Sequence, residues 1–203
     1  MICMHRRFVF PTMLLSGALI LGACGADEDA TPPAGGESTS QDASDVAQHN
    51  NADVDFAQGM IPHHAQAITM ADMVLAQEDS TLTELAEQIK VAQQPEIDEM
   101  TQWLNAWGEE VPAADGHLGM GGMDMDGMMS QDDLDMLMDM SGSGFDSMWL
   151  QMMIEHHEGA IEMAQEQVAD GEYPDALDLA AQIISAQQSE IDQMRNMLES
   201  LDS

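Results

Sequence analysis

Hydrophobic residues recur at helical spacing along four long stretches of the chain. Leu82, Leu85 and Ile89, for example, lie three or four positions apart, which places their side chains on one face of a helix. The pattern predicts four long helices, over residues 53–78, 81–107, 145–170 and 175–201. We therefore predict an all-α fold.

Residues that begin and end helices support these limits. Asp53 is suited to cap the first helix, and Ser80 with Thr81 to cap the second. Gly108 can end the second helix in the left-handed conformation, and Pro174 is suited to the first turn of the fourth.

The segment between the second and third helices, residues 108–144, is a connector of different character. Its first half is rich in Gly, Met and Asp and is not expected to form a stable helix. Residues 132–140 are predicted to form a short helix with Leu134, Leu137 and Met138 on its apolar side.

One stretch of sequence occurs twice, at residues 60–71 and, 93 positions later, at residues 153–164. Both copies carry Met, Ile, His, His, Ala, Ile, Met and Ala at the same offsets. A further likeness relates residues 85–100 to residues 179–194. Residues 52–203 are therefore predicted to form a four-helix bundle of two similar hairpins, residues 52–107 and 145–203, related by a pseudo-twofold axis.

The repeated stretch places its histidines on the buried side of a helix. At about 100° per residue, His64 points from the middle of the apolar face and His63 from its edge, close to Met70. His157 and His156 take the same two places in the second copy. Packing these faces together would bring four imidazoles and several Met sulfurs into one region.

These residue types suit copper. Imidazole binds copper in both oxidation states, and thioether sulfur selects the soft ions Cu(I) and Ag(I). Met accounts for 21 of the 203 residues, and five Met residues lie on the connector between residues 120 and 129. The candidate metal ligands are His63, His64, His156, His157, Met60, Met70, Met153, Met163, Met120, Met123, Met125, Met128 and Met129.

Each metal-binding His needs an acceptor that fixes its tautomer. In the second copy we expect this acceptor among Glu155, Glu158 and Glu162. The first copy has no acids at the equivalent positions, which predicts a weaker site there.

Packing alone offers another interpretation of the same residues. Met at helical spacing is usually core filler, which we expect for Met100, Met194 and Met197. Both interpretations stay open for Met70 and Met163. A lone His on an apolar face is usually a core residue, but a buried imidazole without partners is costly, and two matched pairs favour ligation. The connector can also be an unstructured spacer.

The N-terminal segment predicts export. Residues 1–23 have a basic start and an apolar run typical of a secretory signal. The run ends in Leu21-Gly22-Ala23-Cys24, which resembles a bacterial lipobox and predicts cleavage before Cys24 and lipidation of its sulfur. A plain signal peptide or an uncleaved anchor is the alternative. Residues 24–51 are predicted to be a flexible tether that holds the domain to a membrane, in the periplasm or at the cell surface.

The charge excludes one class of partner. The chain has 38 acidic residues against 4 Lys and Arg, and a formal net charge of −34. Such a charge repels nucleic acid. It favours solubility, for example in a salty habitat, and it gathers cations near the surface.

The paired His motifs support a family resemblance. Phe145-Asp146 and the two repeated stretches resemble the domain of unknown function 305 family, which includes CopM-like periplasmic copper-binding proteins. The resemblance covers roughly residues 52–200. It implies a ferritin-like helical bundle and, for the better-studied members, extracytoplasmic binding of copper or silver by His and Met.

We therefore predict a lipid-anchored binding protein, not an enzyme, that sequesters, buffers or transfers copper. Silver is the alternative ion, and other divalent metals are less favoured. A homo-oligomer or a copper-handling partner protein is compatible with this role.

The first alternative is a ferritin-like di-metal oxidase, which would need Glu three positions before a ligand His. Those positions hold Met60, Ile61, Met153 and Ile154. The second alternative is an acidic structural lipoprotein without a metal.

Overall fold

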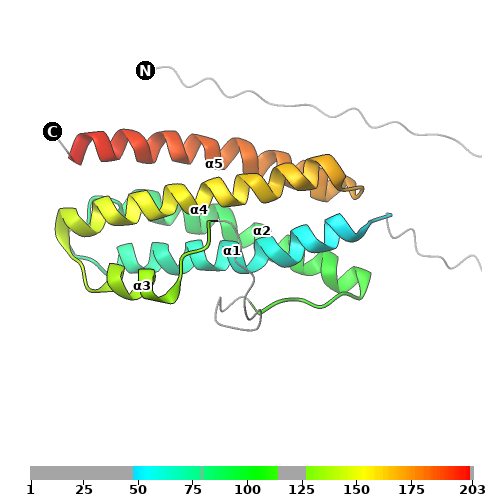
Figure 1. Ribbon diagram of the computed structural model, residues 1–203. Helices are drawn as coiled ribbons and strands as arrows, with labels where there is room; N and C mark the ends of the chain where they lie inside the picture. Colours follow the sequence, from blue (N-terminus) through cyan, green and yellow to red (C-terminus); the bar gives the residue numbers. More distant parts are fainter. Residues whose placement is uncertain (1–47, 79, 114–126, 202–203) are drawn as a thin grey trace, which may run out of the picture. The chain divides into compact units, whose positions relative to one another are not determined.

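The computed structural model describes residues 48–78, 80–113 and 127–201. These residues form helices and no strands, which confirms the predicted all-α class (Figure 1). The helices are α1 (Asn51–Leu75), α2 (Thr83–Trp107), α3 (Gln131–Met138), α4 (Gly142–Asp170) and α5 (Pro174–Leu201). None of the helices in the described ranges has the length and apolar content needed to cross a membrane. The predicted signal peptide and the tether up to residue 47 lie outside the described residues.

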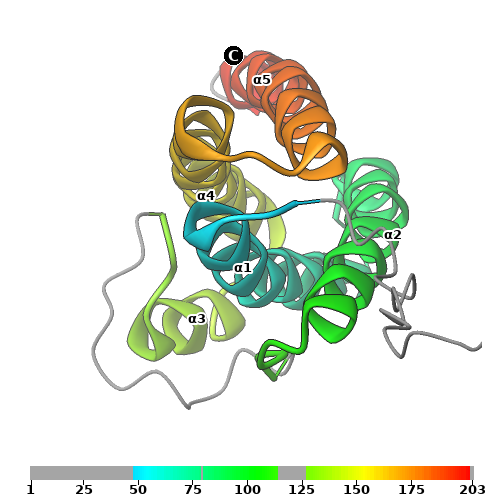
Figure 2. The ribbon, with the colours of Figure 1, turned by 90° about the vertical axis from the view of Figure 1, so that its right-hand side faces the viewer.

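The four long helices pair as the repeat predicted. α1 packs on α2, α4 packs on α5, and the two hairpins meet where α1 packs on α4. Figure 2 shows this arrangement end-on, with α3 beside α1 on the side away from α5. α1 and α4 run antiparallel, since Asn50 at the start of α1 donates a hydrogen bond to the carbonyl of Asp170 at the end of α4, at 2.8 Å.

The helix ends differ in part from the sequence prediction. α1 starts at Asn51, and its cap is Asn50, whose side chain accepts from the Asp53 backbone at 3.1 Å. Asp53 completes the capping box by accepting from the Asn50 backbone at 2.8 Å, so it is the third helical residue and not the cap. Gly108 ends α2 in the left-handed conformation, with φ of 78°, and Pro174 opens α5, both as predicted.

Two buried aspartates hold the hairpins together. Asp53 of α1 accepts from the backbone N–H groups of Glu172 and Tyr173, in the loop between α4 and α5, at 3.1–3.2 Å. Asp146 of α4 accepts from Ser80 Oγ at 2.8 Å and from the Thr81 backbone at 3.2 Å, in the loop between α1 and α2. The N-cap of α2 is Leu82, without a side-chain cap, so the predicted capping by Ser80 and Thr81 was wrong.

The two aspartates stand at the same position of the repeat. Each one binds the loop of the other hairpin. Reciprocal contacts of this kind are what a twofold relation produces. The pseudo-twofold arrangement predicted from the repeat is therefore present in the packing.

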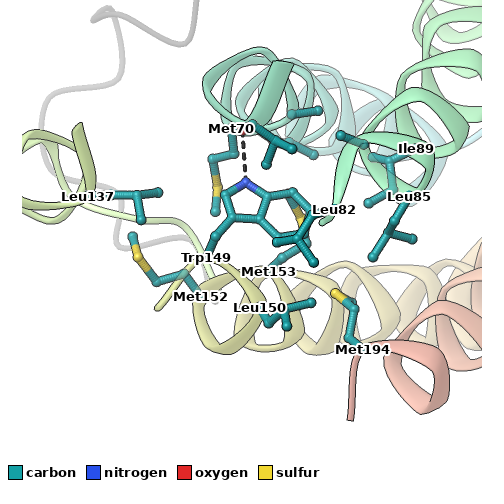
Figure 3. Close-up of a cluster of buried hydrophobic side chains, with 14 of the residues drawn as sticks. Met70, Leu82, Leu85, Ile89, Leu137, Trp149, Leu150, Met152, Met153 and Met194 are labelled. Atoms are coloured by element: carbon teal, nitrogen blue, oxygen red, sulfur yellow. Dashed lines mark hydrogen bonds between the residues drawn. The ribbon is translucent and has the colours of Figure 1, made fainter. Parts of the chain in front are cut away.

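The core at one end of the bundle is built around Trp149. Its indole N–H donates to the Met70 carbonyl at 2.8 Å, which joins α4 to α1 (Figure 3). Leu134 and Leu137 of α3 are buried in the same cluster and fix α3 to the bundle. The short helix predicted at residues 132–140 is thus present at Gln131–Met138. Leu134 and Leu137 have the predicted apolar role, but the prediction was wrong for Met138, which is 54% exposed at the end of the helix.

Candidate metal site

The closest contact between the two His pairs joins His63 of α1 to His156 of α4. Their ring centroids are 3.8 Å apart and the rings are tilted by 41°. His63 is 0% exposed and His156 is 1% exposed. Because the two residues are equivalent in the repeat, the pseudo-twofold axis passes close to this contact.

The other two histidines point toward the outer helices. His64 Nε2 lies 2.6 Å from Glu96 Oε2 of α2, and His157 Nε2 lies 2.7 Å from Glu190 Oε2 of α5. The carboxylate of each pair accepts a proton held at Nε2, which leaves the lone pair of a neutral imidazole on Nδ1. In both rings Nδ1 is buried and has no hydrogen-bond partner. The glutamates thus prepare a buried nitrogen donor on each of these two histidines.

His156 is held in its neutral form. Burial lowers its pKa well below the ordinary value of 6.5, and the nearby His63, His157 and His64 lower it further. The backbone of His63 acts weakly in the other direction, and neither ring nitrogen of His156 makes a hydrogen bond of normal geometry. A neutral, buried imidazole with an unused lone pair is the form that binds a metal ion.

Two buried glutamines add to this polar region. Gln93 and Gln187 are equivalent in the repeat and lie one helical turn before Glu96 and Glu190. They are 3% and 4% exposed, and the side-chain oxygen of each has no hydrogen-bond partner. Buried polar groups are costly when they are unsatisfied. We call His63, His64, His156 and His157, with Glu96 and Glu190, the histidine layer.

The acceptors for the histidines are not the ones expected from the sequence. Glu158 forms an ion pair with Arg195 at 2.8 Å, and Glu155 and Glu162 are exposed. Since the histidines point into the bundle, residues on the outer face of their own helix do not meet them.

The acceptors come from the facing helices instead, and the first copy has one as well as the second. The reason for expecting a weaker first site, the lack of an acceptor in the first copy, therefore does not hold. The usable signal was the identical Glu in the second part of the repeat, at positions 96 and 190.

The sequence-predicted Met ligands lie in different places. Met60 and Met153 are fully buried, one turn before the His pairs on their helices. Met70 belongs to the cluster around Trp149, two turns after His63.

Met163 is partly buried and lines a pocket between α1 and α4 near the start of α1. The helical spacing places both Met70 and Met163 about 10 Å along the axis from the edge histidines. Core packing is therefore sufficient to explain Met70.

The end of the connector is fixed beside the histidine layer. Gln66, one turn after His63, donates to the Met129 carbonyl at 2.9 Å and accepts from the Met129 backbone N–H at 2.8 Å. Gly127 lies against the backbone of α4 at Glu155 and Gly159. Met128 and Met129 are partly buried, whereas Met120, Met123 and Met125 lie outside the described residues.

Comparison with known proteins now settles the family. The profile of the domain of unknown function DUF305 matches residues 53–198. The chain belongs to the DUF305 family. The resemblance predicted from the paired His motifs is thereby confirmed. No curated protein matches the chain in sequence.

Solved structures of DUF305 proteins share this fold. A candidate secreted protein from Streptomyces coelicolor is 30% identical, with a TM-score of 0.67 and coverage of 75% of this chain and 94% of that one. A fragment from Deinococcus radiodurans is 28% identical, with a TM-score of 0.67 and coverage of 74% and 97%. CopM in its Cu(II)-bound form is 36% identical, with a TM-score of 0.60 and coverage of 73% and 96%. CopM also has structures in Cu(I)-bound and Ag-bound forms.

Among the described residues, no three His, Cys, Asp or Glu side chains are arranged to hold a metal ion together. The unused nitrogens of His64, His156 and His157 nevertheless fit an ion that accepts imidazole ligands. A bound ion would therefore require rotation of side chains, a sulfur ligand, or both.

Proposed function

We propose that this DUF305 domain binds a copper or silver ion at the histidine layer. One observation carries the proposal: two equivalent imidazoles, His63 and His156, meet at 3.8 Å inside the bundle. Burial of an imidazole costs free energy unless its nitrogens find hydrogen-bond or metal partners, and four imidazoles are buried here. The likeness to CopM, whose structures contain Cu(I), Cu(II) and Ag, supports copper or silver as the ion.

The residues have different roles in this proposal. Neutral imidazole nitrogens of the four histidines bind the ion, and their softness suits Cu(II) as well as Cu(I). Glu96 and Glu190 orient His64 and His157 and fix their tautomers. Met60 and Met153 lie one turn away and offer sulfur to Cu(I) or Ag(I).

The connector supplies a second set of soft ligands in this proposal. Met128 and Met129 are held beside α1 and α4, and Met120, Met123 and Met125 precede them in the chain. Thioethers on a Gly-rich segment suit an ion that is received or passed on. Substitution of these five Met by Leu should weaken Cu(I) binding more than Cu(II) binding.

We also propose that the domain works outside the cytoplasm, attached to a membrane by lipid on Cys24. The sequence of residues 1–24 supports this location, and the related Streptomyces coelicolor protein is a candidate secreted protein. Mass spectrometry of the protein from bacterial membranes would detect the diacyl modification. A Cys24→Ser variant should be released from the membrane.

The role that we propose is sequestration, buffering or transfer of the ion, without turnover. The di-metal oxidase alternative predicts oxygen uptake when the protein is mixed with Fe(II). The structural alternative predicts that protein from copper-supplemented cells contains no metal. An oxygen electrode and elemental analysis distinguish the three functions.

Titration with Cu(I), Cu(II) and Ag(I), in competition with a coloured chelator, tests the proposal. A His63→Asn, His156→Asn double variant should bind at least about tenfold more weakly, because two ligands are lost. His49→Asn is the matched control, since His49 stacks on Trp107, with ring centroids 4.3 Å apart, and is not part of the layer. Equal affinity of the double variant and the wild type would contradict the proposal.

A further inference from the structure

A second feature of α1 and α4 lies away from the histidine layer. A groove with a volume of about 590 Å³ opens between the start of α1 and the end of α4. Phe56, Gly59 and Met163 form its apolar part, with Pro62 beside them. We call it the open groove. None of the residues that the structure describes fills it with an apolar side chain from another helix.

The pseudo-twofold relation gives the open groove a counterpart at the other end of the bundle. The repeat places Phe56 at the position of Trp149, and Gly59 at that of Met152. Met163 corresponds to Met70 in the same way.

Trp149, Met152 and Met70 belong to the cluster that buries Leu134 and Leu137 of α3 (Figure 3). One groove of this matched pair is therefore occupied by a short amphipathic helix of the chain itself. Because the two grooves are equivalent in the repeat, a short amphipathic helix is the kind of element that we expect to fit the open groove.

The rims of the two grooves differ in charge. Three exposed carboxylates border the open groove: Asp55, Glu166 and Asp170. We call the groove that α3 occupies the α3 groove. The equivalent residues there are uncharged: Met148, Met73 and Gln77. An acidic helix such as α3 would be repelled from the open groove, and a basic one would be attracted.

The described part of the chain has no unpaired fixed cation to offer the open groove. The described part of the chain has only Lys90 and Arg195 as fixed cations, and these pair with Asp72 and Glu158. A second copy of the chain is a poor occupant, since each copy has a formal net charge of −34.

We propose that the open groove is a docking site for a basic amphipathic helix of a partner protein. The apolar side chains of that helix would lie on Phe56, Gly59 and Met163, in the way that Leu134 and Leu137 lie in the α3 groove. Its Lys or Arg side chains would face Asp55, Glu166 and Asp170. This site does not depend on the histidine layer or on any metal.

The probe is a synthetic peptide of residues 130–140 in which Asp132, Asp133, Asp135 and Asp139 are replaced by Lys. It keeps the two Leu anchors, and a covalent staple between two solvent-facing positions keeps so short a peptide helical. The acidic peptide of natural sequence, with the same staple, is the comparison. Binding of each labelled peptide to the whole chain is measured by fluorescence anisotropy at low and at high salt.

Gly59→Leu fills the open groove. A Cβ at Gly59 meets only Met163 Sδ, at 3.5 Å, so the backbone does not have to move, and helix propensity favours the change. This variant should weaken binding of the basic peptide by about tenfold or more, because its anchors lose their place. Circular dichroism verifies that the variant is folded.

A charge variant completes the test. Asp55→Asn with Glu166→Gln and Asp170→Asn should weaken binding by about fivefold at low salt and reduce its salt dependence. The matched control neutralises three exposed acids of α2: Glu84→Gln, Glu87→Gln and Asp98→Asn.

The proposal predicts saturable binding of the basic peptide that Gly59→Leu removes and the α2 control retains. No saturable binding to the wild-type chain would overturn it. So would equal binding of the acidic peptide, equal binding to Gly59→Leu, or an equal loss in the α2 control.

Discussion

The imidazole rings of His63 and His156 lie 3.8 Å apart, centroid to centroid, in a buried contact between α1 and α4. Two charged imidazoles at this distance in an apolar core would repel each other strongly. The contact therefore requires that at least one ring be neutral. It also places nitrogen donors from both halves of the repeat at a single point.

The neutral state of His156 predicts acid sensitivity. Its folded-state pKa is lowered, first by burial and then by His63, His157 and His64. The unfolded chain therefore takes up a proton near pH 6.5, where the folded chain does not, and stability falls as the pH falls below that value. Urea unfolding at about pH 7.5 and about pH 5 should show this loss. A His156→Gln variant should show a smaller loss, and an unchanged pH dependence would count against a neutral His156.

Asp53 and Asp146 are predicted to be the main polar contacts between the hairpins. Asp53→Asn or Asp146→Asn should each lower the free energy of unfolding by about 2–4 kcal/mol, because buried N–H donors lose a charged acceptor. The neighbouring exposed Asp55→Asn is the control and should have little effect. Thermal unfolding measured by circular dichroism compares the three variants.

Asp53 also predicts behaviour in strong acid. Burial alone would raise its pKa, but hydrogen bonds from Asn50, Gln167, Tyr173 and Glu172 outweigh this effect and lower the pKa below its ordinary value of 3.8. Its contribution is therefore complete above pH 3.8 and is lost as the pH falls through the lower folded-state value. The Asp53→Asn variant should lack this part of the acid transition.

Much of the fold was predictable because the repeat is long and the apolar period is regular. The helical wheel placed His64 and His157 on the buried face, and both are 0% exposed. The wheel describes one helix, however, and does not show what faces it. Contacts to Glu96 and Glu190 depend on how the helices pack, so the sequence prediction selected acids on the wrong helix.

The edge histidines show the same limit of sequence reasoning. From the wheel, His63 and His156 are less central than their neighbours, yet they make the contact between the two hairpins. An edge position of α1 becomes central only when α4 packs beside it. In the same way, Met163 shares the repeat position of Met70 but lines a groove, because α3 covers only one end of the bundle.

Glu96 and Glu190 are predicted to position the ligand histidines. Glu96→Gln with Glu190→Gln should lower copper affinity by about 10- to 100-fold, since His64 and His157 lose the acceptors that fix their tautomer. Glu158→Gln is the matched control, because Glu158 lies on the outside of α4 with Arg195. Spectra of the Cu(II) complex should change in the double variant and not in the control. Unchanged affinity of the double variant would exclude a positioning role.

Substitution of Gly127 tests whether the end of the connector is held against α4. Its φ of 79° favours glycine, and a Cβ there would meet the Glu155 carbonyl oxygen at 2.7 Å. Gly108 has nearly the same φ, 78°, with open space around it, so Gly108→Ala measures the backbone cost alone. Gly127→Ala should destabilise the chain by more than the roughly 1 kcal/mol expected for Gly108→Ala. Equal costs for the two variants would show that the connector is not held against α4.

The position of a copper ion in crystals of the copper-loaded chain tests the central claim most directly. Anomalous diffraction at the copper edge locates the ion without reference to any ligand assignment. We predict a peak inside the bundle, about 2.0–2.1 Å from a ring nitrogen of His63 or His156, the usual distance between a metal ion and a His nitrogen. A peak found only at surface carboxylates, with the four imidazoles unchanged, would contradict the account.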